Sequence, residues 1–251
     1  MDSKKRFSNR VDTYVKYRPS YPKEAIDCLY DTVGLHPDCE VADVGAGTGI
    51  FTKLLLERGS RVTAVEPNKE MREAAIEALG SNANFRTIPG SAEDTGLPDE
   101  SVDFITCAQS FHWFHQQRAK AEFHRILKPG GKAVLIWNSR LTEGTAFLEE
   151  YEHLLQRYGT DYNEVKHTNI SPESLIPFFA AGTMRIARFP NRQLLDFDGL
   201  AGRLHSSSYS PTPEHPNYEP MMRELKAIFD RNQQGGRISF DYVTEIFWGA
   251  I

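Results

Sequence analysis

The chain has 251 residues, of which 29 are basic and 34 acidic, for a formal net charge of −5. This length is enough to bury one hydrophobic core, and single α/β domains often reach it. The acidic balance provides no basic footprint for nucleic acid and no polybasic patch for a membrane, and no apolar run is long enough to cross a bilayer.

The cysteines and the N-terminal segment indicate the compartment. Cys28, Cys39 and Cys107 are odd in number and lack the spacing of a metal site, which argues against a disulfide framework. The first ten residues are charged and lack the apolar core of a signal peptide. We therefore expect a cytoplasmic protein without a metal and without a membrane or nucleic-acid partner.

An aromatic and basic segment, residues 8–22, precedes the first expected helix, residues 23–33. The apolar side chains Ile26, Leu29 and Val33 recur on one face of that helix. The prolines of the preceding segment prevent one continuous helix. Two interpretations stay open for this arm: a surface segment packed by its tyrosines, or a lid over a ligand pocket.

A strand, a glycine turn and a helix follow one another over residues 41–55. Gly45, Gly47 and Gly49 supply the turn, and glycine lets a ligand lie against the peptide plane. The start of the helix adds unpaired N–H groups. Ile50 stands where the dinucleotide pattern needs its third glycine, and no Gly-Lys-Ser/Thr ending follows. The turn favours a nucleoside ligand without phosphate, and an NAD(P)-dependent oxidoreductase is the weaker alternative.

The second strand, residues 62–65, ends at Glu66-Pro67. In a doubly wound sheet an acid at this strand end can accept hydrogen bonds from two ribose hydroxyls. Asn68 is expected to cap the next helix, on which apolar residues recur at helical spacing. Met71, in its first turn, suits either the core or a contact with adenine.

The third and fourth strands are expected at residues 85–88 and 101–108. The third is followed by the polar turn Gly90–Asp94. The segment beyond the fourth strand, Gln109–His115, faces the ligand crevice of such a sheet. It contains two histidines among three aromatic residues, which favours an aromatic pocket wall over plain packing.

The second half of the chain is expected to complete the sheet. Its predicted elements are a helix ended by Lys128–Gly131, a strand at 132–138, helices at 144–158 and 172–179, a strand at 184–189, a helix around 221–229 and a half-buried last strand from Ile238. Residues 194–216 are dense in turn formers. This segment is either a flexible surface loop or a cap over the substrate.

Three of these features together resemble the class I S-adenosylmethionine-dependent methyltransferases, over roughly residues 11–138. They are Asp43-x-Gly45-x-Gly47-x-Gly49, Glu66 and Leu127-Lys-Pro-Gly-Gly131. The resemblance implies a Rossmann-like, doubly wound α/β fold with a seven-stranded, mostly parallel sheet and an antiparallel last strand. It implies one domain over 1–251: an arm and helix (1–35), a cofactor-binding core (36–140) and a substrate-side half (141–251) with a cap near 194–234.

The resemblance also implies a cofactor, S-adenosyl-L-methionine, with S-adenosyl-L-homocysteine as product. Arg18 would pair with the methionine carboxylate. Family members usually carry an acid where Ser91 stands here, so Ser91, Glu93 or the backbone are alternatives for binding the adenine amino group. The expected cofactor residues are Tyr17, Arg18, Asp43, Gly45, Ala46, Gly47, Gly49, Glu66, Pro67, Met71, Ser91, Ala92, Glu93, Gln109 and Ser110.

The acceptor is expected to be a small molecule and the protein a monomer or homodimer. The motifs of nucleobase amino-group, pyrimidine C5 and protein arginine methyltransferases are absent. The arm and the loop resemble enzymes related to the trans-aconitate methyltransferases, which esterify small acids. The expected acceptor-side residues are His112, Trp113, Arg203 and Tyr209.

The acceptor decides which catalytic group is needed. A hydroxyl requires a base, for which His112 is the candidate, with Phe111, Trp113 and Tyr209 as aromatic walls. A carboxylate requires a cation, for which Arg18, Arg203 and Arg140 are candidates. A non-catalytic binding or regulatory protein on the same fold is the other alternative.

Overall fold

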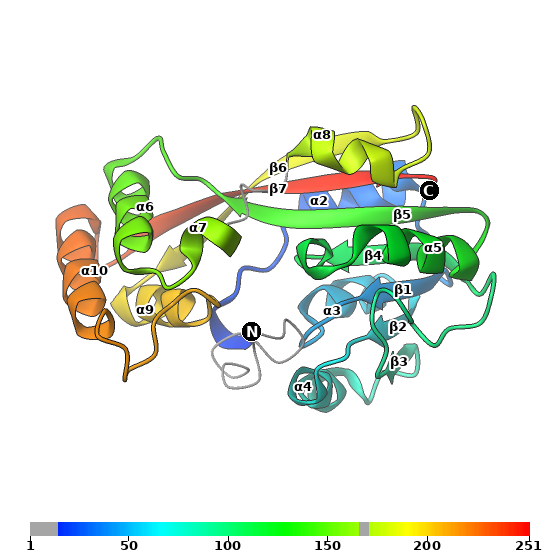
Figure 1. The fold of residues 1–251 in the computed structure, drawn as a ribbon, viewed down its shortest axis with the longest axis horizontal. Coiled ribbons are helices and arrows are strands. Elements are labelled where there is room, and N and C mark those ends of the chain that lie inside the picture. Colours follow the sequence, from blue (N-terminus) through cyan, green and yellow to red (C-terminus); the bar gives the residue numbers. More distant parts are fainter. Residues whose placement is uncertain (1–14, 166–170) are drawn as a thin grey trace.

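The computed structural model describes residues 15–165 and 171–251, and its seven strands form one sheet (Figure 1). The strand order is β3-β2-β1-β4-β5-β7-β6. Neighbours from β3 to β5 pair in parallel, and β7 runs antiparallel to both of its partners. The expected fold is confirmed. The strands are β1 (Glu40–Val44), β2 (Arg61–Val65), β3 (Phe85–Ile88), β4 (Val102–Ala108), β5 (Leu127–Arg140), β6 (Arg185–Leu195) and β7 (Ile238–Gly249).

Helices cover both faces of the sheet. On one face lie α2 (Lys23–Cys28), its π-helical continuation η2 (Leu29–Val33), α3 (Ile50–Leu56) and α4 (Lys69–Leu79), packed on alternate residues of β1, β2, β4 and β5. On the other lie α5 (Gln116–Ile126), α8 (Pro172–Leu175) and η5 (Ile176–Phe178). The central strands are buried on both sides, which explains their nearly continuous apolar sequences.

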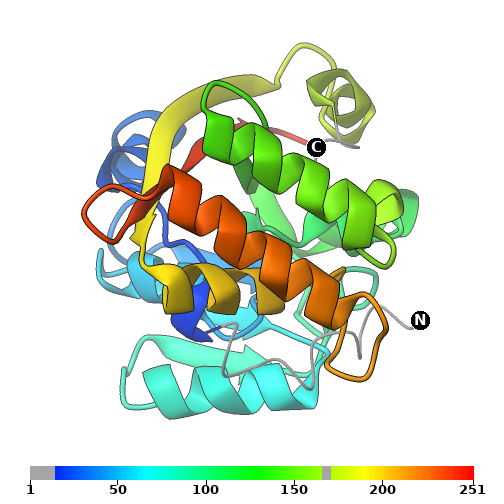
Figure 2. The same cartoon turned by 90° about the vertical axis from the view of Figure 1, so that its left-hand side faces the viewer.

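A third apolar cluster lies beyond one end of the sheet. It joins α6 (Ala146–Tyr158), α9 (Phe197–His205) and α10 (Tyr218–Asn232) to the end of β6 and the start of β7. Figure 2 shows these helices side by side, and we call them the cap. The long strands β5 and β7 extend from the core of the sheet into the cap (Figure 1). The short helix α7 (Tyr162–Val165) follows α6.

Three expected boundaries differ from the structure. Residues 197–205, inside the segment considered as a loop, form α9, whose start is capped by the Asp196 side chain, 2.8 Å from the Gly199 N–H. Residues 128–131 belong to β5 rather than to a turn, because α5 already ends at Ile126. β6 continues to Leu195 because β7 pairs with it along its whole length, and its proline is tolerated because β6 is an edge strand.

Candidate active site

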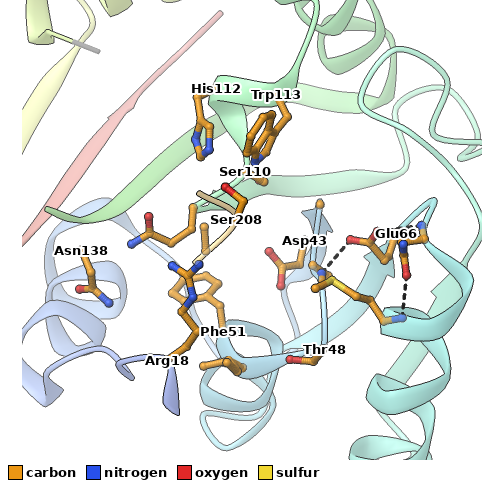
Figure 3. Close-up of a pocket in the computed structure, with 18 of the residues that line it drawn as sticks. Arg18, Asp43, Thr48, Phe51, Glu66, Ser110, His112, Trp113, Asn138 and Ser208 are labelled. Atoms are coloured by element: carbon orange, nitrogen blue, oxygen red, sulfur yellow. Dashed lines mark hydrogen bonds between the residues drawn. The ribbon is translucent and has the colours of Figure 1, made fainter. Parts of the chain in front are cut away.

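A cavity of about 230 Å³ lies at the carboxyl ends of β1, β2 and β4, between the sheet and the cap. The strand order reverses direction between β1 and β4, the place where doubly wound sheets bind ligands. In Figure 3, Glu66 and Asp43 lie toward one end, Asn138 toward the other, and His112 and Trp113 along one side.

The structure brings nearly all of the predicted site residues together around this cavity. All four acceptor-side residues line it, and so do the predicted cofactor residues other than Tyr17 and Gly49. The lining includes Arg18, Asp43, Gly45, Ala46, Gly47, Glu66, Pro67, Met71, Ser91, Ala92, Glu93, Gln109, Ser110, His112, Trp113, Arg203 and Tyr209.

Tyr17 and Gly49 lie outside the lining and serve packing instead. The Tyr17 ring lies against Gly202 of α9, where an added Cβ would stand 2.3 Å from Cε2. Gly49 begins α3 with φ 82°, and a Cβ there would stand 2.7 Å from Cδ1 of Leu79 in α4. The first contact joins the arm to the cap, and the second joins two helices.

The glycine turn closes tightly on the end of β4. Gly45 has φ 70°, and its N–H donates to the Val65 carbonyl over 2.8 Å. A Cβ on Gly45 would lie 2.5 Å from Cβ of Ser110, whose hydroxyl donates to the Val44 carbonyl over 2.7 Å. No side chain fits between the turn and Ser110, so the bare backbone of the turn lines the cavity.

Glu66 is held at the edge of this turn. Its side chain accepts hydrogen bonds from the N–H groups of Gly47 and Asn68, each over 2.8 Å (Figure 3). Burial raises the pKa of Glu66, and the two backbone donors oppose that shift. A carboxylate offers about four acceptor positions, so two remain for hydroxyl donors. Asn68 also caps α4 through the Met71 N–H, as predicted.

Asp43 lies beneath the turn and is fully buried. It accepts hydrogen bonds from the hydroxyls of Thr52, over 2.6 Å, and Thr106, over 3.0 Å. Burial raises the pKa of Asp43 to about 6, although both hydroxyls lower it. Asp43 thus joins β1, α3 and β4, and its charge is poorly compensated at neutral pH.

The chain turns sharply between β4 and the short helix η3 (Phe111–Trp113). Gln109 has φ 61°, an uncommon conformation for a residue other than glycine. Such strain often accompanies a functional site. Only part of the predicted aromatic wall lines the cavity. His112 and Trp113 do so, whereas Phe111 is buried in the core, where its ring centroid lies 4.6 Å from that of Phe178. Phe114 lines the cavity as well.

The polar turn after β3 carries the groups predicted to bind the adenine amino group. Ser91, Ala92 and Glu93 all line the cavity. The Ser91 N–H donates to the Asp94 carbonyl over 2.9 Å, and a Glu93 carboxylate oxygen accepts from the His115 N–H over 2.8 Å. Both residues are therefore held in place at the rim.

The described part of the arm forms a wall of the cavity. Arg18 donates to the Ser206 carbonyl over 2.9 Å, next to α9. The Ser20 carbonyl accepts from Asn138 of β5 and Asn191 of β6 over 3.2 and 2.8 Å. These contacts hold the described part of the arm against both halves, where Arg18, Pro19 and Tyr21 line the cavity. Residues 8–14 of the predicted arm lie outside the described residues.

The cap side of the cavity carries two buried arginines with different partners. Arg140 forms an ion pair with Glu152 and donates to the Tyr162 hydroxyl over 2.7 Å. Arg203 donates to the hydroxyls of Tyr242, over 3.0 Å, and Ser207, over 2.9 Å. Unlike Arg140, Arg203 forms no ion pair with any acid in the described ranges.

Several lining residues were not predicted. Asn138 could have been found by applying the strand-end argument to the fifth strand, which neighbours the fourth. The others sit beside predicted residues but carry no distinct signal of their own: Pro19, Tyr21, Thr48, Ile50, Phe51, Asn68, Ala108 and Ser208.

Over residues 15–165 and 171–251, no three or more of His, Cys, Asp and Glu gather in a way that would hold a metal ion. In the same ranges, no helix has the length and apolarity to span a membrane.

Comparison with known proteins places these features in context. A methyltransferase domain model matches residues 42–135. The chain is 30% identical over 247 residues to an uncharacterized methyltransferase-like protein of Schizosaccharomyces pombe, covering 97% of this chain and 94% of that protein. It is 36% identical over 191 residues to an uncharacterized methyltransferase of Mycobacterium tuberculosis, covering 70% and 75%.

The fold has solved counterparts at lower identity. A protein of Anaeromyxobacter dehalogenans described as a type II methyltransferase superposes with a TM-score of 0.69 at 21% identity, covering 93% of this chain and 98% of that one. The YcgJ protein of Bacillus subtilis superposes with a TM-score of 0.58 at 22% identity, covering 91% and 98%.

Proposed function

We propose that this chain methylates an oxygen of a small molecule. The chain belongs to the family of class I S-adenosylmethionine-dependent methyltransferases. The acceptor oxygen belongs to a carboxylate or a hydroxyl. The cofactor is S-adenosylmethionine, and the demethylated product is S-adenosylhomocysteine.

The cofactor half of the cavity fits S-adenosylmethionine group by group. Glu66 has acceptor capacity for two ribose hydroxyls. Gly45 and Gly47, with φ 70° and 58°, present bare backbone to the nucleoside. Arg18 is assigned to the methionine carboxylate, and Met71 with the Ser91–Glu93 turn is assigned to the adenine.

The acceptor half of the cavity supplies alignment and shelter from water. The cofactor brings a methyl group already activated by positive sulfur, so the protein mainly orients the acceptor and excludes solvent. Trp113 and Tyr209 present aromatic faces, which stabilise a nearby positive charge. His112 lies on the same wall and is the base if the acceptor is a hydroxyl.

One observation carries this proposal: a single cavity has an acidic end at the sheet, with Asp43 and Glu66, and a cationic end at the cap, with Arg203, and the aromatic wall also lines it. The acidic end suits a nucleoside with a positive sulfur. The cationic end suits an acceptor with a partial or full negative charge on oxygen.

Calorimetric titration with S-adenosylmethionine, S-adenosylhomocysteine and NAD, each separately, tests the cofactor. Binding of the first two without NAD is expected, and binding of NAD alone would overturn the proposal in favour of an oxidoreductase. The acceptor is then tested with panels of small acids and alcohols, with S-adenosylhomocysteine release as the signal and duplex DNA as a negative control. Cofactor binding without turnover on any panel would favour the non-catalytic alternative.

A further inference from the structure

We propose that Arg203 anchors a carboxylate of the acceptor, so that the substrate is an organic acid. This inference rests on the proposed methyl transfer. It concerns how the acceptor is held, and it applies whether the methylated oxygen belongs to the anchored carboxylate or to another group of the same molecule.

The surroundings of Arg203 satisfy its hydrogen bonds without balancing its charge. The residue is only 6% exposed, yet it lines the cavity. Its partners are hydroxyls, and its guanidinium lies 5.7 Å from the Phe240 ring centroid and 5.9 Å from that of Tyr242. A buried charge without a counter-charge is costly to the folded state. An anionic ligand in the cavity would supply the missing charge.

The guanidinium of Arg203 keeps its positive charge. Burial lowers the pKa of Arg203, but the nearby Tyr242, Tyr209 and Tyr151 raise it, and the net direction is upward. Arginine also stays protonated under all ordinary conditions. The site is therefore a permanent cation.

The orientation of the guanidinium is fixed by a chain of hydrogen bonds. Nε donates to the Tyr242 hydroxyl, which in turn donates to the Gln193 side chain over 2.8 Å. One terminal nitrogen, Nη1, donates to Ser207 over 2.9 Å. The other, Nη2, has no hydrogen bond to any residue in the described parts of the chain. A carboxylate can therefore take Nη2 without displacing a protein partner.

Arg140 provides the contrast within the same cavity. It is equally buried, at 6% exposure, but Glu152 neutralises it and Tyr162 fills a donor position. Arg18 lies on the arm and is assigned to the cofactor. Among these three arginines, Arg203 is the one whose position in the cap suits the acceptor.

The test uses Arg203→Met and Arg203→Lys in the full chain, with Arg140→Met as matched control. Phenylacetate, succinate and hexanoate are titrated calorimetrically in the presence of saturating S-adenosylhomocysteine, with phenylacetamide as the neutral analogue. We expect wild type to bind at least one acid and not the amide. Arg203→Met should weaken that binding about tenfold or more, and Arg203→Lys should weaken it less.

Two further readouts separate an acceptor site from a structural role. Without ligand, Arg203→Met should melt at or above the wild-type temperature, because it removes an unbalanced charge. Arg140→Met should melt lower, because it strands Glu152. S-adenosylhomocysteine affinity should be unchanged in Arg203→Met.

Four results would overturn the inference. Three of them concern Arg203→Met: it binds the acid as well as wild type, it loses affinity for S-adenosylhomocysteine to the same extent as for the acid, or its melting temperature falls clearly. The fourth is a wild-type protein that binds S-adenosylhomocysteine but none of the acids. A wild-type protein that does not bind S-adenosylhomocysteine would instead refute the proposed function.

Discussion

The free energy of unfolding of Asp43→Asn, taken relative to that of wild type, is expected to increase as the pH rises. The pKa of Asp43 is raised from 3.8 to about 6 in the folded protein, chiefly by burial. The folded state therefore keeps a proton that the unfolded chain releases. The resulting stabilisation is complete below pH 3.8 and is lost as the pH rises through about 6. Asparagine does not titrate, so the variant escapes this loss.

The magnitude follows from the size of the shift. A difference of about two pKa units corresponds to about 3 kcal/mol of folding free energy. About 2 kcal/mol of this falls between pH ~4.5 and pH ~7.5. The variant also alters the hydrogen bonds from Thr52 and Thr106, but that cost does not vary with pH. The prediction therefore concerns the change in the stability difference and not its absolute value.

Urea unfolding followed by circular dichroism, at four pH values across this interval, measures the free energy of unfolding of both proteins. Asp103→Asn is the matched control. Burial raises the pKa of Asp103, but Lys128 and the Glu40 N–H outweigh it, so the net shift is downward. Its titration then lies at or below pH 3.8, and the control difference should be nearly flat over the same interval.

A stability difference between Asp43→Asn and wild type that stays constant from pH ~4.5 to ~7.5 would refute the raised pKa. A difference that moved in the opposite direction would show instead that the two threonine hydroxyls outweigh burial.

Three substitutions test the cavity itself. Gly45→Ala should abolish S-adenosylhomocysteine binding in calorimetry and lower the melting temperature. Residue 45 has a left-handed backbone conformation, and its added Cβ would lie 2.5 Å from Cβ of Ser110. Near-normal affinity would show that the turn can relax. Glu66→Gln should weaken S-adenosylhomocysteine binding by about tenfold to a thousandfold. The substitution replaces a charged acceptor and turns an amide N–H toward a backbone N–H donor. A loss of affinity below twofold would contradict the role of Glu66 in binding the ribose. If the acceptor is a carboxylate, the kcat of His112→Gln should stay within about tenfold of the wild-type value. A fall in kcat of about a hundredfold or more would identify a hydroxyl acceptor, with His112 as its base.

The cofactor half was predictable because its signals are local. The spacing of Gly45, Gly47 and Gly49 and the acid Glu66 at a strand end each occupy a few consecutive residues, and the doubly wound sheet brings their strand ends together. The fold class and most of the lining followed from these signals.

The cap was less predictable because packing overrides sequence preference there. α9 contains Gly199 and Gly202, which disfavour helix. Gly202 is nevertheless required, since the Tyr17 ring occupies the space of its missing side chain. Likewise, no sequence pattern shows that Arg203 lacks an acid partner or that Tyr242, 39 positions away, holds it. The left-handed conformation of Gln109 carries no sequence signal either.

The position of β7 has a consequence for biosynthesis. β7 lies between β5 and β6, although it follows both in sequence, and β6 pairs with no other strand of the described sheet. It also carries Tyr242, which holds Arg203, and Thr244, whose hydroxyl donates to Asn138. A nascent chain emerging from the ribosome can therefore assemble the parallel strands and the nucleoside half first. The side of the cavity that contains Arg203 and Asn138 takes shape only when β7 inserts between two strands that were made before it.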